Sequence, residues 1–147
     1  MDELRSLARS FICAARGVFA AIQHERNLRI HLCVTFYVVF AGFLLELSPT
    51  EWVLILLCIG IVLSAELGNT AIEKICDFIT RNHSSEIKFI KDCAAGAVLI
   101  SAILAAVAGC LIFLPKITFQ AIKPALGVTV VTLPAFLYFI FRRRTFK

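Results

Sequence analysis

The sequence predicts an all-α integral membrane protein. Hydrophobic side chains make up 60% of the 147 residues, only 17% of the residues are charged, and the mean hydropathy is +0.89. Soluble domains carry about 25% charged residues, so this balance lies far outside their range. The chain also contains four long apolar runs, each at or near the roughly 20 residues that cross a bilayer, at residues 32–45, 52–72, 93–115 and 124–141.

The first segment, residues 3–24, is expected to form an amphipathic helix that lies in the membrane interface. Apolar residues recur at helical spacing on one face, whereas Arg5, Arg9 and Arg16 share another. Such a helix rests its apolar side on the lipid and directs its arginines toward phosphate groups. Lipid headgroups are the expected partners of these arginines, and a specific nucleotide contact by one of them is the alternative.

Three membrane-spanning helices are expected next, near residues 30–47, 51–76 and 92–115. Together with the interfacial helix they form a predicted domain over residues 1–119. Residues 120–147 are expected to add a fourth membrane-spanning helix that ends in a basic tail. The chain is too small for a second large domain.

The distribution of charge predicts the orientation of these helices. Basic residues gather in the N-terminal segment, in the connection after the second crossing and at the C-terminus. Because cytoplasmic loops carry an excess of Lys and Arg, the pattern indicates four crossings with both termini in the cytoplasm. The net charge of +5 then mostly faces lipid headgroups, and nucleic acid is not expected as a partner. The six cysteines form no CxxC pair and lie mostly in apolar runs, which favours small buried thiols over disulfides or a zinc site.

A line of oxygen-bearing side chains begins inside the second crossing. Glu66 is a carboxylate in an apolar run, where it costs a few kcal/mol on insertion scales. If the helix starts near Trp52 at the outer surface, Glu66 lies about 21 Å along it, in the inner third of a hydrocarbon layer roughly 30 Å thick. Asn69 and Glu73 follow at i+3 and i+7 on the same face, and Asp77 continues the line. This arrangement suits chemistry between a lipid-buried group and a water-borne, metal-carrying group.

Further polar residues are expected at the level of Glu73. Glu25 lies just before the first crossing, and Lys91 and Asp92 lie just before the third. Two carboxylates at one level can share a divalent cation, and Mg²⁺ is commonly held by one or two carboxylates together with substrate phosphates. Glu25 and Glu73 are therefore the candidate metal ligands.

Each of these residues also has a simpler interpretation. Glu25 and Arg29 are four residues apart and could form an ordinary helix ion pair. Asp92 could be a helix N-cap. Glu73 and Lys74 could be the solvated end of a helix. Glu66 resists a structural explanation because the second apolar run offers it no buried cation.

These motifs resemble the prokaryotic diacylglycerol kinase family, particularly its undecaprenol kinase branch. The resemblance covers roughly residues 5–116 and rests on Asn27-Leu28-Arg29-Ile30-His31, on Glu66-Leu67-Gly68-Asn69-Thr70-Ala71-Ile72-Glu73, on Asp77 and on the run from Lys91 to Leu99. It implies an ATP-dependent kinase that phosphorylates the primary hydroxyl of a membrane lipid, undecaprenol or diacylglycerol. The implied location is the bacterial inner membrane, with the active site on its cytoplasmic side.

The resemblance also implies roles for individual residues. The residue that matches Glu66 is the catalytic base, and those that match Glu25 and Glu73 hold Mg²⁺ on ATP. The implied nucleotide-binding set is Glu25, Asn69, Glu73, Lys91 and Asp92. Members of the family are homotrimers whose active sites form between neighbouring subunits.

The sequence departs from the family's pattern in several places, among them Ser6, where the family has a nucleotide-contacting arginine, Gly68, one loop and the fourth crossing. The loop that reads Asn82-His83-Ser84 differs from the family's triplet, so no role is assigned to it. The fourth crossing has no counterpart in the three-crossing core, and it is interpreted as an anchor or an oligomer-packing helix. A small proton-coupled exporter that uses Glu66 is the alternative function, and a noncatalytic scaffold is a third. The exporter gives no reason for carboxylates and a lysine to gather at the cytoplasmic surface.

Overall fold

The computed structural model describes residues 2–79, 84–117 and 119–142, and these residues form helices joined by short connections. The helices are α1 (Asp2–His24), α2 (Arg26–Leu44), α3 (Pro49–Ile79), α4 (Ser85–Phe113), the short 3₁₀ helix η1 (Leu114–Lys116) and α5 (Phe119–Phe141). No strand occurs among the described residues. Two parts of the sequence prediction, residues 82–83 and most of the basic tail, lie outside them.

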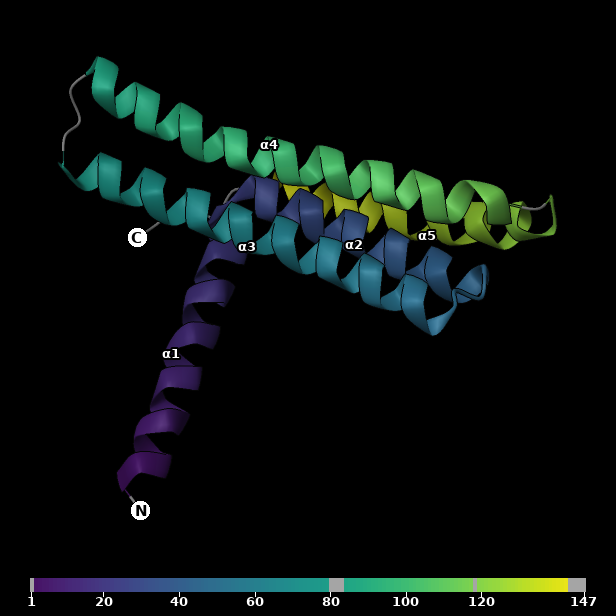
Figure 1. Ribbon diagram of the computed structural model, residues 1–147, viewed down its shortest axis with the longest axis horizontal. Coiled ribbons are helices and arrows are strands. Elements are labelled where there is room, and N and C mark those ends of the chain that lie inside the picture. Colours follow the sequence, from purple (N-terminus) through teal and green to yellow (C-terminus); the bar gives the residue numbers. More distant parts are fainter. Residues whose placement is uncertain (1, 80–83, 118, 143–147) are drawn as a thin grey trace.

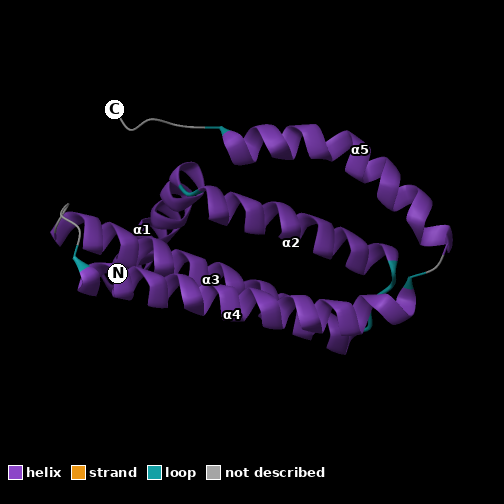
Figure 2. Cartoon of the chain, turned by 90° about the horizontal axis from the view of Figure 1, so that it is seen from above, coloured by secondary structure: helices purple, strands orange, loops and turns teal. Residues whose placement is uncertain are grey.

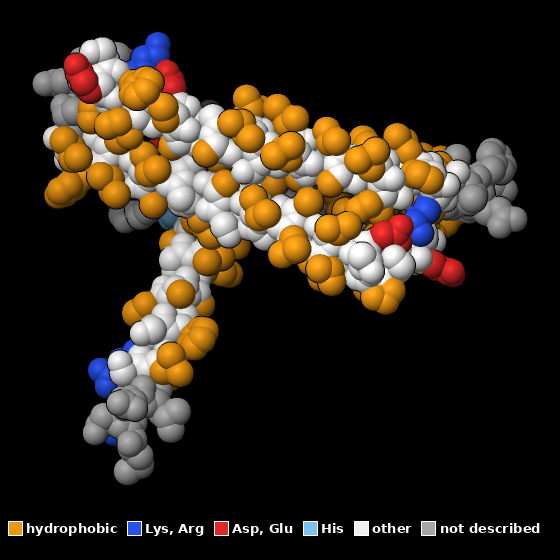
Figure 3. Space-filling view, viewed as in Figure 1, with side chains coloured by type: hydrophobic (Ala, Val, Ile, Leu, Met, Phe, Trp, Pro, Cys, Tyr) orange, Lys and Arg blue, Asp and Glu red, His pale blue; other side chains and the backbone are white. Residues whose placement is uncertain are grey.

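Four of the described helices are long and apolar enough to cross a membrane. The qualifying segments are 26–44, 49–79, 85–116 and 124–141, by length and composition. Hydrophobic side chains cover the middle of the bundle in Figure 3, and the charged side chains gather near its ends and on α1. The predicted class, an all-α integral membrane protein with four crossings, is therefore confirmed.

The arrangement of the helices agrees with the topology that the charges predict. The α1–α2 junction, the α3–α4 connection and the C-terminal end of α5 lie at one end of the bundle, and the other two connections lie at the opposite end (Figure 1). Helix α1 projects from the bundle at a steep angle, as expected for an interfacial helix. Its apolar side chains Leu7, Phe11 and Phe19 are exposed, so they are free to rest on lipid.

The start of α3 is fixed by a capping box at the outer end of the bundle. The Glu51 carboxylate accepts hydrogen bonds from the Ser48 amide at 2.7 Å and the Ser48 hydroxyl at 2.8 Å. Pro49 opens the helix, where its missing N–H costs nothing. Lys116 lies 3.1 Å from Glu51 and so connects the end of α4 to the start of α3.

A close approach of two helices sets the tight connection between α2 and α3. A Cβ atom on Gly42 would lie 2.7 Å from the Trp52 ring and 3.1 Å from Leu47, so only glycine leaves room for the indole. Glu46, in the turn itself, has φ 50°, which is uncommon for a residue other than glycine. The indole thus packs directly against the backbone of α2.

Helix α5 packs on α2 of its own chain. The rings of Phe36 and Tyr37 meet Phe136 edge to face, with centroids 5.2 and 5.5 Å apart. The Tyr37 and Thr132 hydroxyls form a hydrogen bond of 2.8 Å. Figure 2 shows α5 following α2 along the bundle, while α3 and α4 form a long antiparallel pair beside them.

Helices α2, α3 and α4 begin before the predicted crossings because a helix can start in the interface ahead of the apolar run, whereas α2 ends at residue 44, three residues earlier than predicted. Helix α4 begins at Ser85, with Ser84 as its N-cap, so Asp92 lies inside the helix and its interpretation as an N-cap is wrong. All six cysteines are free thiols, but only Cys33 and Cys76 are buried inside the chain, so the prediction of buried thiols holds for these two and is wrong for the exposed ones.

Candidate active site

Glu66 is the most buried carboxylate of the described chain. Its side chain lies on α3, and the residue is only 3% exposed. The Asn27 side chain forms a hydrogen bond with this carboxylate, and the charges of Glu73 and Glu25 act on it. Among the described ion pairs none involves Glu66. The buried carboxylate therefore has an amide partner and carboxylate neighbours, with no cation to neutralise it.

The predicted line of oxygen atoms on α3 runs from buried to exposed. Asn69 is buried, Glu73 is half-buried and Asp77 is exposed. The Asn69 amide donates a hydrogen bond to the Glu73 carboxylate at 3.0 Å. Because these residues share one face of a helix, their side chains follow one another from the buried Glu66 toward water.

Glu25 joins this line from the junction of α1 and α2. It is the N-cap residue of α2, with φ −98° and ψ 119°, and this extended backbone breaks the continuous helix between α1 and α2. Its carboxylate forms an ion pair with Lys74 of α3 at 3.0 Å. Arg29 is bound elsewhere, so the interpretation of Glu25 and Arg29 as an ion pair is wrong.

Lys91 reaches the same end of the bundle from α4. Its amino group forms an ion pair with Asp77 at 2.5 Å and lies within electrostatic range of Glu73. Asp92 is exposed one residue further on, and no hydrogen bond or ion pair connects it to another described residue. The structure thus groups Glu25, Glu66, Asn69, Glu73 and Lys91, and leaves Asp92 at the edge of the group.

The chemistry of this group fits a hard divalent cation that arrives with phosphates. Glu25 and Glu73 supply carboxylate oxygens, and the Asn69 carbonyl oxygen is buried without a hydrogen-bond partner among the described residues. No cluster of three or more His, Cys, Asp or Glu side chains able to hold a metal occurs in residues 2–79, 84–117 and 119–142. One or two carboxylates with substrate phosphates is the usual arrangement for Mg²⁺, so three protein ligands are not required.

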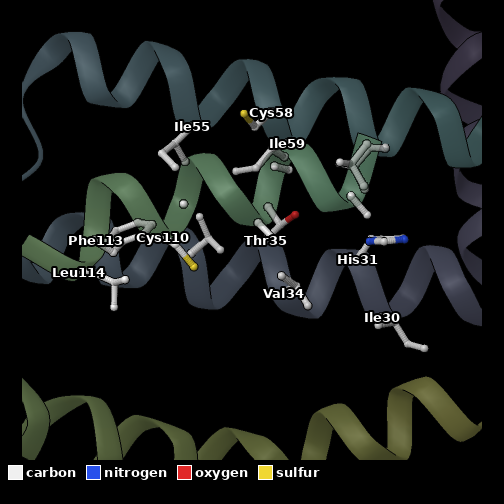
Figure 4. A pocket seen from close by; sticks show the side chains of 17 residues that line it. Ile30, His31, Val34, Thr35, Ile55, Cys58, Ile59, Cys110, Phe113 and Leu114 are labelled. Atoms are coloured by element: carbon white, nitrogen blue, oxygen red, sulfur yellow. The ribbon is translucent and has the colours of Figure 1, made fainter. Parts of the chain in front are cut away.

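An apolar groove of about 480 Å³ opens beside this group. Its walls come from α2, α3 and α4, and Figure 4 shows His31, Thr35, Ile59, Cys110 and Phe113 around it. On α3 the groove ends at Leu63, one turn before Glu66, and on α2 it begins at Ile30, one turn after Asn27. The buried carboxylate therefore lies near one end of an apolar groove, at the end of the bundle that contains the α1–α2 junction.

Sequence reasoning missed the position of Asn27. The motif from Asn27 to His31 was noted as a signature, but nothing in the spacing indicates which helix its polar side chains face. Asn27 lies only two residues from Glu25, a spacing at which helical side chains do not share a face, so the sequence offered no signal for this contact.

Comparisons with known proteins show the family of the chain. A family model for prokaryotic diacylglycerol kinase matches residues 12–113. The chain is 45% identical over 116 residues to the undecaprenol kinase of Bacillus subtilis (strain 168), an alignment that covers 79% of this chain and 94% of the relative. It is 38% identical over 109 residues to the diacylglycerol kinase of Synechocystis sp. (strain ATCC 27184 / PCC 6803 / Kazusa), covering 74% of this chain and 62% of the relative. No solved structure matches the chain.

Four membrane crossings with a carboxylate site at one end define a membrane-embedded lipid kinase, an enzyme that transfers a phosphoryl group from ATP to a lipid alcohol. The chain belongs to the prokaryotic diacylglycerol kinase family. The predicted enzyme class is confirmed, and these matches give no support to the exporter.

Proposed function

We propose that the protein phosphorylates the primary hydroxyl of undecaprenol at the cytoplasmic face of the bacterial inner membrane, with Glu66 as the general base. The observation that carries this proposal is the position of a buried carboxylate, which forms no ion pair with another described residue, at the end of an apolar groove. A lipid whose chain lies in the groove would place its terminal hydroxyl near Glu66, at a depth that a water-soluble nucleotide can also reach.

Glu66 would accept the hydroxyl proton while the lipid oxygen attacks the γ-phosphorus of ATP. The bond between this phosphorus and the β,γ-bridging oxygen breaks, so the products are lipid phosphate, ADP and one proton. Phosphoryl transfer depends mainly on positioning and on neutralising charge, so a few well-placed side chains suffice. The Asn27 amide holds the Glu66 carboxylate in place through its hydrogen bond.

Glu25 and Glu73 would hold Mg²⁺, and Asn69, Lys91 and Asp92 would complete the nucleotide side of the site. The unpartnered Asn69 oxygen and the gathering of two carboxylates near Glu66 support this assignment. When bound, Mg²⁺ neutralises charge on the phosphates of ATP. Lys91, already close to Glu73, would contribute a further positive charge at the same level.

The groove supports a substrate with one long chain. Its lining residues on α4 run from Ala102 to Phe113, about 16 Å at 1.5 Å per residue. Lining residues from three helices are almost entirely apolar, which suits an isoprenoid chain. The similarity to undecaprenol kinase, which extends over 94% of that relative, favours the polyprenol over diacylglycerol.

The active enzyme would be a homotrimer with sites shared between neighbouring subunits. At most 22% of the residues in any of the four apolar windows are buried inside the chain. Asp92 faces outward next to the site, where a neighbouring subunit could bring it to a bound nucleotide. A Cβ atom on Gly68 would meet nothing within 4 Å, so this face of α3 leaves room for another helix.

The test uses the purified protein in mixed micelles with labelled ATP and either undecaprenol or diacylglycerol. We expect Glu66→Gln to remain folded and to lose at least about 100-fold in kcat, the lower range for general base catalysis. Glu51→Gln is the matched control, because it makes the same change at the outer end of α3. Substantial turnover by Glu66→Gln would remove the base assignment. Preferential phosphorylation of diacylglycerol would remove the assignment of the lipid.

A further inference from the structure

The last turn of α5 contacts two arginines at the start of α2. Arg29 donates hydrogen bonds to the Ile140 carbonyl oxygen from Nε at 3.3 Å and from Nη2 at 3.0 Å. Its guanidinium lies 6.0 Å from the centroid of the Phe139 ring, and that of Arg26 lies 5.9 Å from Phe141. Three consecutive residues of α5 therefore contact the two arginines: the Ile140 carbonyl and the Phe139 ring contact Arg29, and the Phe141 ring contacts Arg26.

The same Arg29 guanidinium also binds the end of α1. Its Nη1 donates to the carbonyl oxygens of Ile22 at 3.2 Å and Gln23 at 2.9 Å. These carbonyls and that of Ile140 lie in the last turns of their helices, where intrahelical donors are lacking and the helix dipole is negative. Arg29 is only 6% exposed, so its charge is matched almost entirely by these helix ends. One buried side chain thus joins the C-terminal ends of α1 and α5.

The residues between and beside these arginines belong to the active site. Glu25 pairs with Lys74, and Asn27 bonds with Glu66, both on α3. The short segment of residues 25–29 therefore sends two side chains to the site and two to α5. A rigid hold on Arg26 and Arg29 restricts where the backbone carries Glu25 and Asn27, since Arg26 is bonded directly to both of these residues in the chain.

We propose that α5 is a positioning element of the kinase. Its last turn, through Arg29 and Arg26, fixes the α1–α2 junction and holds Glu25 at the nucleotide side of the site. This proposal rests on the proposed function, in which Glu25 carries the metal that accompanies ATP. Helix α5 begins after residues 12–113, which the family model matches, so its contacts with Arg26 and Arg29 are an addition to the part of the chain that the family shares. Arg29 is a positioning residue in this arrangement, because it acts through Glu25 and Asn27.

The test separates nucleotide binding from lipid binding and from folding. Deleting residues 139–147 removes all three contacts of α5, and deleting residues 143–147 removes most of the basic tail while keeping them. We expect the longer deletion to raise KM for Mg-ATP about tenfold, the loss that matches hydrogen bonds to a charged group. KM for the lipid and the melting temperature should change little. The shorter deletion should behave as wild type.

A double-mutant cycle tests whether α5 acts through Arg29. Arg29→Gln combined with Arg26→Gln should raise KM for Mg-ATP at least as much as the longer deletion, and adding that deletion to this pair of substitutions should have no further effect. Phe139→Ala with Phe141→Ala weakens the contact without shortening the chain, for use if the deletion fails to fold. Thr132→Val is the control, because it breaks the bond to Tyr37 in the same α2–α5 interface away from the junction.

The outcomes separate this proposal from the proposed function. Multiplicative effects of the deletion and the pair Arg26→Gln and Arg29→Gln, or an unchanged KM for Mg-ATP in both, would overturn the positioning role while wild-type lipid phosphorylation stands. Absence of lipid phosphorylation by the wild type would instead overturn the proposed function. A shift caused equally by Thr132→Val would show that α5 acts only as a packing helix.

Discussion

The hydrogen bond between Asn27 and Glu66 gives a quantitative test of the site. Asn27→Ala removes the donor and leaves a carboxylate that is 3% exposed. A hydrogen bond to a charged group is worth about 1.5–3 kcal/mol. Asn27 itself is exposed, so water can replace part of the lost bond, and the lower end of the range applies. The expected loss in kcat/KM for the lipid is therefore about tenfold.

Asn27→Asp provides the sharper comparison. It keeps the shape of the side chain but places a further negative charge beside Glu66, whose neighbourhood already includes Glu25 and Glu73. We expect activity to fall in the order wild type, Asn27→Ala, Asn27→Asp, measured as initial rates with saturating ATP and varied lipid. Asn27→Asp activity equal to that of wild type would refute the reasoning, because a carboxylate cannot donate the hydrogen bond.

Two further predictions concern nucleotide binding and the α2–α3 connection. Lys91→Met should raise KM for ATP about tenfold without changing the melting temperature. Asp77→Asn breaks the same exposed ion pair but keeps the lysine, so it should retain the affinity for ATP. Equal effects of the two substitutions on KM would mean that only the ion pair matters. Gly42→Ala should destabilise the protein by about 1–3 kcal/mol because the new Cβ overlaps the Trp52 ring. Gly60→Ala is the control, because nothing lies near its Cβ, and it should be neutral or stabilising. Thermal unfolding in detergent measures both variants. A tolerated Gly42→Ala would contradict the close approach.

The part of the site that lies on one helix could be predicted from the sequence. Glu66, Asn69 and Glu73 share a face because helical periodicity places them there, and the structure confirms that Asn69 reaches Glu73. Their catalytic and nucleotide-binding roles stay predictions. Glu25 was placed at the right level, but its partner was not identified, because Lys74 and Arg29 satisfy charge pairing equally well from spacing alone.

The fourth crossing shows where sequence reasoning stopped. Its apolar composition predicts a membrane helix, and the structure supplies one. An anchor and an oligomer-packing helix were the two interpretations, yet α5 packs on α2 of its own chain through Tyr37 and Thr132. An apolar helix surface carries little information about which neighbour covers it, because lipid and another helix are both apolar.

The sequence by itself determined the membrane class, the number of crossings and the line of oxygen atoms on α3, and it predicts the orientation of the crossings. These features follow from hydropathy, from the placement of lysine and arginine, and from the 3.6-residue period, which are all local properties of the chain. Only the tertiary structure decided that Asn27 meets Glu66, that Lys74 meets Glu25 and that Arg29 binds a carbonyl 111 residues away. Contacts between helices depend on how the helices pack, and periodicity within each helix does not specify that packing.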